Sequence, residues 1–224
     1  MRPFGFYVHV PFCDGKCGYC AFYSTRYENR LADRYVAAVE RELELSGGCP
    51  DGAFDTVYFG GGTPTILSDP QMERLCRLVT AGRPRPVEWT VEANPGSVTG
   101  AALEVLARAG VNRISIGAQS FDDDILRQMG RRHRGADIGA AAATARDAGI
   151  TNFGIDLIAC VPGVDKRKWR ATLESALALE PKHVSVYALT VEEGTALNAK
   201  VKDGARLAPG DEAQLMFLHM AGQV

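Results

Sequence analysis

The chain has 224 residues, of which 46% are hydrophobic and 23% are charged, and this composition predicts one globular domain and excludes a disordered or fibrous chain. The 25 Lys and Arg residues against 27 Asp and Glu residues give a formal net charge of -2, so we expect no nucleic-acid partner. No run approaches the roughly 18 apolar residues of a membrane helix and the N-terminus does not resemble a secretory signal, so we expect no membrane span and a cytoplasmic location.

Segments with the character of strands and of helices alternate along the chain. Short runs rich in β-branched and aromatic residues predict strands, in chain order, at residues 6–10, 56–59, 87–91, 113–116, 153–158 and 183–189. Segments with a helical apolar period predict helices at residues 31–45, 69–81, 99–109, 122–129, 136–148 and 166–179, with a further helix beginning near Asp211. Six βα units in series predict an α/β fold with a parallel sheet, which is either an open doubly wound sheet or a barrel.

Unusual residues gather where the expected strands end. Three cysteines follow the first strand, glycines at 60–62 follow the second, and Glu92, Gln119 and Asp156 follow or belong to the next three. Each of these loops, taken alone, is typical of an ordinary βα turn. Because the carboxyl ends of parallel strands meet at one edge of a sheet or barrel, we expect the loops together to form a single active site.

Three of the six cysteines lie within eight residues, at Cys13, Cys17 and Cys20, with the spacing C-x3-C-x2-C. Structural zinc is disfavoured, because it takes four ligands, no fourth cysteine follows, and His9 belongs to an expected strand. Three thiolates on a cubane iron–sulfur cluster leave one iron open to a substrate or cofactor. The spacing therefore favours an iron–sulfur cluster.

Other reactive residue types are expected to lie outside this chemistry. Cys76 has the helical spacing of a core residue, Cys160 ends an apolar run, and Cys49 lies in a loop with no second ligand nearby. A basic run at 131–134 is typical of a solvated face, apart from Arg131, for which we favour a binding role. No catalytic residue is assigned.

Five further blocks occur in a characteristic order, at residues 7–13, 58–65, 112–133, 156–163 and 183–195. Together with the cysteine spacing they resemble the radical S-adenosylmethionine (SAM) superfamily. Within it they resemble the branch of oxygen-independent coproporphyrinogen III oxidases and of heme chaperones of the HemW type. The resemblance implies a partial (β/α)6 barrel of parallel strands over residues 1–200. It also implies that residues 201–224 begin a C-terminal region that is truncated here, since the branch continues into a domain that covers the barrel mouth.

The resemblance implies the cofactors and their residues as well. Cys13, Cys17 and Cys20 would hold a 4Fe-4S cluster whose open iron binds SAM, and one electron would cleave SAM to a 5'-deoxyadenosyl radical. Gly61 and Gly62 would admit the methionyl amine. The full set of expected SAM-binding residues, by position, is Tyr7, Tyr19, Gly61, Gly62, Thr63, Glu92, Gln119, Arg131, Asp156 and Ala188.

One position separates the two kinds of protein in this branch. The oxidase has a further cysteine two residues after the third cluster cysteine, where this chain has Phe22. The resemblance therefore implies a HemW-like heme chaperone, with heme or porphyrin, an electron donor and a heme-acceptor protein as partners. The alternatives are a coproporphyrinogen oxidase-type enzyme and a HemN-like radical SAM methyltransferase.

Overall fold

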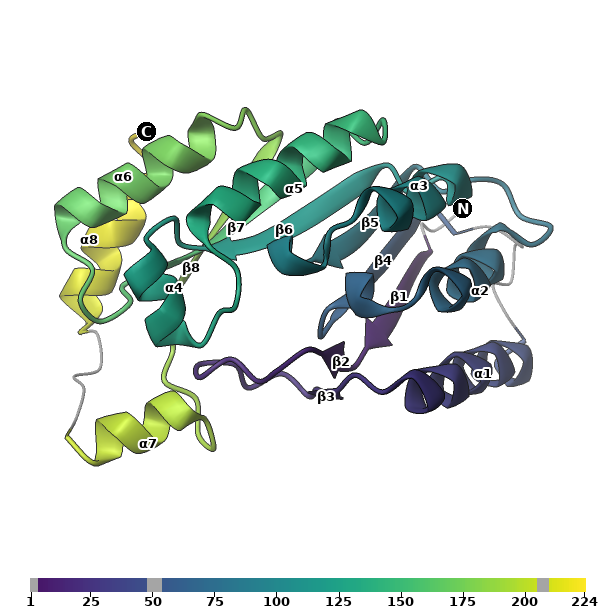
Figure 1. Ribbon diagram of the computed structural model, residues 1–224, viewed down its shortest axis with the longest axis horizontal. Coiled ribbons are helices and arrows are strands. Elements are labelled where there is room, and N and C mark those ends of the chain that lie inside the picture. The colour runs from purple at the N-terminus through teal and green to yellow at the C-terminus, as the bar shows by residue number, and fades with distance from the viewer. Residues whose placement is uncertain (1–3, 48–53, 205–209) are drawn as a thin grey trace.

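The computed structural model describes residues 4–47, 54–204 and 210–224, so Cys49 lies outside the described residues. Six parallel strands form one sheet whose spatial order is their order along the chain (Figure 1). They are β1 (Gly5–Val10), β4 (Thr56–Gly61), β5 (Glu88–Ala93), β6 (Arg113–Gln119), β7 (Phe153–Ala159) and β8 (His183–Ala188). A doubly wound sheet requires a reversal of strand order. The order here has none, which decides between the two architectures that the periodicity allowed and matches the expected partial barrel.

Helices follow the strands and pack beside one another on one face of the sheet. α1 packs on α2, α2 on α3 and α3 on α5, while α8 packs on α6 and β8 (Figure 1). The helices are α1 (Asn29–Leu45), α2 (Asp69–Thr80), α3 (Gly100–Ala109), α4 (Asp123–Met129), α5 (Gly135–Asp147), α6 (Lys166–Leu177), α7 (Ala196–Lys202) and α8 (Asp211–Ala221). Among the described residues, no helix has both the length and the apolar character to cross a membrane.

The two faces of the sheet differ because successive strand residues point to opposite sides. One set is apolar and fully buried against the helices, for example Phe59, Trp89 and Ile116. The other set is polar and lines an open cavity, for example Glu92 and Asp156. The sheet therefore separates an apolar core from a polar concave face.

The helix boundaries follow from capping residues in the sequence. Asp122 accepts hydrogen bonds from the backbone N–H groups of Asp124 and Ile125 at 3.0 and 3.1 Å, which begins α4. Lys168 contacts the Asp122 carboxylate at 2.8 Å, and this hydrogen bond lowers the pKa of Asp122. Gly130, with a φ of 79°, ends the helix in the left-handed region.

Five short elements have no counterpart among the expected ones. β2 (Phe12–Cys13) and β3 (Thr25–Arg26) form a two-residue parallel pair, η1 (Pro64–Ile66) and η2 (Pro95–Ser97) are single 3-10 turns, and α7 is a short helix with no buried residue. The strand pair and the turns are too short for an apolar period, and α7 buries no residue that would show one. α8, which was expected near Asp211, is tied to the barrel by a hydrogen bond from Trp169 Nε1 to the Phe217 carbonyl at 2.9 Å.

Candidate functional site

A cavity of about 850 Å³ lies on the concave face and reaches the loops at the carboxyl ends of the strands. The three clustered cysteines line it. So do nine of the ten residues expected to bind SAM, namely Tyr19, Gly61, Gly62, Thr63, Glu92, Gln119, Arg131, Asp156 and Ala188. Tyr7 does not line it. Its hydroxyl is hydrogen-bonded to His9 Nδ1 at 3.0 Å and its ring stacks on Tyr58.

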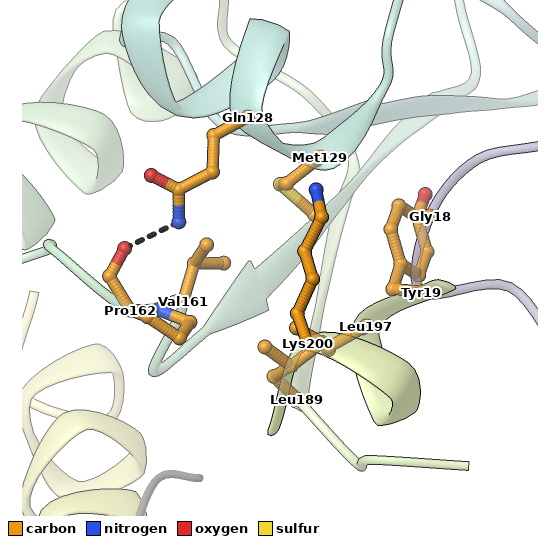
Figure 2. A pocket seen from close by; sticks show the side chains of 9 residues that line it. All are labelled: Gly18, Tyr19, Gln128, Met129, Val161, Pro162, Leu189, Leu197 and Lys200. Carbon is orange, nitrogen blue, oxygen red and sulfur yellow. Dashed lines mark hydrogen bonds between the residues drawn. The ribbon is translucent and has the colours of Figure 1, made fainter. Parts of the chain in front are cut away.

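The cysteines lie on an irregular segment, residues 12–26, that we call the cysteine loop. Its middle is held by backbone hydrogen bonds from two helices distant in sequence. The Gly18 N–H donates to the Met129 carbonyl of α4 at 3.0 Å, and the Leu197 N–H of α7 donates to the Gly18 carbonyl at 2.8 Å. Figure 2 shows the small, largely apolar space behind this contact, about 30 Å³. α4 and α7 therefore form the rear support of the cysteine loop.

Two of the thiols are within reach of side-chain donors. Thr63 Oγ1 lies 3.8 Å from Cys13 Sγ and Arg131 NH1 lies 3.7 Å from Cys17 Sγ. Burial raises the pKa of Cys13, and the hydrogen bond from Thr63 opposes that rise. Within residues 4–47, 54–204 and 210–224, no three His, Cys, Asp or Glu side chains converge on the position of one metal ion. Thiolates of a cubane bind different irons, so three cysteines on one loop are a donor set that such a cluster takes.

Two of the other cysteines, Cys76 and Cys160, lie in the core, as their sequence context predicted. Cys76 and Cys160 are 3% and 5% exposed and pack in the core. Burial raises the pKa of Cys76 to about 12, so this thiol stays protonated at neutral pH.

The glycine loop after β4 is shaped by contacts within the chain. Gly61 has a φ of 106°, and a Cβ there would lie 2.6 Å from the His9 ring. A Cβ on Gly62 would lie 2.6 Å from the Phe12 carbonyl oxygen, where the cysteine loop begins. From the sequence, we expect these glycines to leave room for a ligand. The structure shows that close packing of the chain itself already requires both.

The carboxylates of Glu92 and Asp156 lie on the concave face, and each accepts a hydrogen bond from a hydroxyl group. Tyr58 donates to Glu92 Oε1 at 2.6 Å, and the Gly61 N–H donates to Oε2 at 3.1 Å. Ser115 donates to Asp156 Oδ2 at 2.9 Å. We call Glu92, Asp156, Tyr58 and Ser115 the acid row. Burial raises the pKa of Glu92, the two hydrogen bonds oppose this, and the charge of Asp156 adds to the rise.

Tyr58 and Ser115 were not among the site residues expected from the sequence, although their alternation with apolar residues could have indicated them. Both alternate with fully or nearly buried apolar neighbours, Val57 and Phe59 on β4 and Ile114 and Ile116 on β6. Parallel strands covered on both faces are typically apolar throughout. A polar residue at every second position therefore marks an open face.

The end of β6 has an unusual backbone and is contacted by Arg131 and by the buried His133. Gln119 has a φ of 67° beside an irregularity in the β6–β7 register. Arg131 NH2 donates to the Gly117 carbonyl at 2.6 Å, and its buried Nε has no hydrogen-bond partner among the described residues. His133 is 4% exposed and contacts the Ala118 carbonyl at 3.2 Å. Burial, then the charge of Arg131, lowers the pKa of His133 to about 4.

This geometry corrects the interpretation of the basic run at 131–134. Arg132 is exposed, as expected, and pairs with Asp14 at 3.7 Å. His133 does not face solvent, because it packs beneath the end of β6. The Arg131 side chain lines the cavity beside the cysteine loop, so its guanidinium is within reach of a ligand there.

Comparison with known proteins shows the family of the chain. The Radical SAM superfamily model matches residues 7–176. The chain is 35% identical to heme chaperone HemW of Bacillus subtilis over 94% of this chain and 57% of that protein. It is 37% identical to heme chaperone HemW of Escherichia coli over 89% of this chain and 54% of that protein.

Among solved structures, coproporphyrinogen III oxidase (HemN) from Escherichia coli, described as a radical SAM enzyme, superposes with a TM-score of 0.86 at 30% identity, over 98% of this chain and 51% of HemN. The chain thus spans about half the length of the proteins it matches. The superfamily implies a 4Fe-4S cluster and SAM as cofactors. The chain belongs to the radical SAM superfamily, in its HemW- and HemN-like branch.

Proposed function

We propose that Cys13, Cys17 and Cys20 hold a 4Fe-4S cluster. Support comes from three partly exposed thiols that share one loop and one cavity, with donors from Thr63 and Arg131 at two of them. N–H and O–H donors to cluster sulfurs are among the features that set the potential of such a cluster. When bound, the cluster and SAM together supply one-electron reductive cleavage of SAM.

We propose that SAM occupies the cavity beside the cysteine loop. The Arg131 guanidinium, which lines this cavity, is the donor suited to the methionyl carboxylate. The carboxylates of Glu92 and Asp156 and the Gln119 side chain are the acceptors suited to an ammonium or to ribose hydroxyls. Ala188, at the end of β8, leaves room for the base. The observation that carries the proposal is that one cavity brings these residues and the three thiols together.

We infer that the whole protein works as a HemW-like heme chaperone, which binds heme and transfers it to an acceptor protein in the cytoplasm. The likeness to HemW proteins and Phe22, in place of the further cysteine of the oxidase, support this function. Residues 1–200 supply the barrel in this proposal, and residues 201–224 begin a further region.

A coproporphyrinogen oxidase-type activity is the second candidate. The superposition on HemN favours it, and Phe22, whose side chain lines the cavity, opposes it. The test is anaerobic reconstitution followed by four assays on one sample: iron content, heme titration, 5'-deoxyadenosine formation with reductant, and conversion of coproporphyrinogen III with reductant and SAM. Heme binding without conversion of coproporphyrinogen III supports the chaperone. Loss of two carboxyl groups from coproporphyrinogen III, followed by mass, supports the oxidase.

A further inference from the structure

The cavity continues past the acid row toward the opposite ends of the strands. Its lining there includes Arg113 and His183, which are the first residues of β6 and β8. Gln119 lies six residues beyond Arg113 on β6, a rise of about 20 Å. This end of the cavity, which we call the floor, therefore lies well away from the cysteine loop.

Arg113 is mostly buried at the floor, and its hydrogen-bonding capacity is largely unused. Its side chain is 17% exposed, and NH1 donates to Thr90 Oγ1 at 3.1 Å. The carboxylate beside it, Glu88 Oε1, is 4.0 Å from NH1 and belongs to a half-exposed side chain. A guanidinium has five N–H donors. Only the bond to Thr90 holds one of them at normal hydrogen-bond distance among the residues described.

The guanidinium lines the cavity beside β7. A Cβ at Gly154 on β7 would lie 3.5 Å from Arg113 NH2, which is an ordinary van der Waals contact. Gly154 pairs in register with His183 on β8. The side chain of His183 also lines the cavity, and its imidazole can supply a further donor to a ligand there.

The concave face carries charges of both signs. The acid row carries two carboxylates, and Arg113 at the floor is a permanent cation whose carboxylate neighbour, Glu88, lies 4.0 Å away and is half-exposed. Arg is the side chain best suited to bidentate recognition of a carboxylate. A ligand with a carboxylate at one end would be oriented by this pattern, with that end directed away from the acid row.

We propose that Arg113 forms a second binding subsite, which takes a carboxylate of the molecule that enters the cavity beside SAM. The inference deepens the proposed function, on which it rests for the presence of SAM at the cysteine end. The heme or porphyrin of the proposed function carries propionate side chains, and the new element is that Arg113 binds one of them.

A purely structural role makes a different prediction. If Arg113 served only to pair with Glu88, then Arg113→Gln and Glu88→Gln would have equal effects. If Arg113 binds a ligand carboxylate, only the loss of the guanidinium weakens binding. Arg113→Lys keeps the positive charge without the fork and serves as a second variant with a milder change in packing.

The test titrates the full chain, with and without reconstituted cluster, with coproporphyrin III and with its tetramethyl ester, following porphyrin fluorescence. We expect Arg113→Gln to weaken binding of the acid about tenfold or more, the range for a charge-assisted hydrogen bond, and to leave binding of the ester unchanged. Arg113→Lys should fall between parent and Arg113→Gln. Glu88→Gln should match the parent.

Several results would overturn the subsite: parental affinity for the acid in Arg113→Gln, equal losses in Arg113→Gln and Glu88→Gln, or no binding of the acid by the parent. Iron content and SAM affinity are measured on the same samples. A parent that binds no iron or SAM contradicts the proposed function, whereas the acid and ester comparison judges the subsite by itself.

Discussion

The cysteine loop and the acid row meet at one cavity, but different parts of the sequence hold them in place. The acid row is carried by β4, β5, β6 and β7, where regular alternation fixes the direction of each side chain. The cysteine loop has little regular structure and depends on Met129, Leu197 and the glycine loop after β4. The chemistry of the cysteine loop is evident in its local sequence, whereas its geometry depends on distant segments.

The largest expected effect is the loss of a cluster ligand. Cys17→Ala should reduce iron from about four atoms per chain to a small residue, because the remaining thiols cannot hold the cluster alone. Iron analysis after anaerobic reconstitution measures this. Cys76→Ala, which removes a buried thiol of the core, should leave iron content unchanged. Equal iron in Cys17→Ala and the parent would contradict the assignment.

The second expected effect shows how the cysteine loop depends on its distant support. Gly62→Ala places a Cβ against the backbone of Phe12 and should lower the free energy of unfolding by about 2 kcal/mol or more, with lower iron content. Urea unfolding measures the stability. Gly100→Ala, where a Cβ meets nothing within 4 Å, is the matched control and should be neutral or stabilising. Equal stability of both variants would show that the cysteine loop tolerates displacement.

The third effect concerns the residue that links the two regions. Arg131→Ala removes the donor that contacts Cys17 and Gly117, and should weaken SAM binding by about 1.5–3 kcal/mol. Calorimetric titration of the reconstituted chain measures it. Arg132→Ala removes a neighbouring, exposed guanidinium and should change SAM affinity little. If both variants bind SAM as the parent does, Arg131 lies outside the SAM site.

The smallest effect is a pH-dependent one within the acid row. Burial raises the folded-state pKa of Glu92 above its ordinary value of 4.5, so its contribution to stability is fully present below that pH and falls as the pH rises through the folded pKa. Tyr58→Phe removes a donor to the carboxylate and should raise this pKa further.

The stability lost in Tyr58→Phe should therefore be larger at pH 7, about 1 kcal/mol, than at pH 4.5. Urea unfolding at the two pH values measures the difference. Tyr27→Phe, which removes a hydroxyl bonded to Asn29 and Gln71 away from the acid row, should show no such pH dependence. A loss in Tyr58→Phe that is the same at both pH values would mean that Glu92 does not titrate as described.

Much of the fold was predictable from sequence because each strand and helix has its own apolar period and its own stop signals. The expected strand at residues 153–158 is one residue shorter than β7 at one end, and the expected helix at 136–148 is displaced from α5 by one residue at each end. α7 and the β2–β3 pair were not predictable, since contacts with distant residues define them. A barrel can be distinguished from a doubly wound sheet only by the spatial order of the strands, which the apolar periodicity of the sequence does not show.

The site was predictable where residue type alone indicates chemistry, as at the three cysteines, Glu92 and Asp156. Partners such as Ser115 were missed because a single hydroxyl on a strand has many ordinary explanations. His133 was placed on a solvated face because it follows two arginines, and its burial depends on packing beneath β6. The left-handed backbone of Gln119 has no local sequence signal, since it is not a glycine.

The central claim is that the cluster held by the cysteine loop and SAM share one cavity. Electron paramagnetic resonance of the reduced, reconstituted chain, recorded before and after addition of SAM, tests it directly. We expect a cluster signal that changes when SAM is added, because SAM would bind the iron that no cysteine holds. A cluster signal that is identical with and without saturating SAM would contradict it.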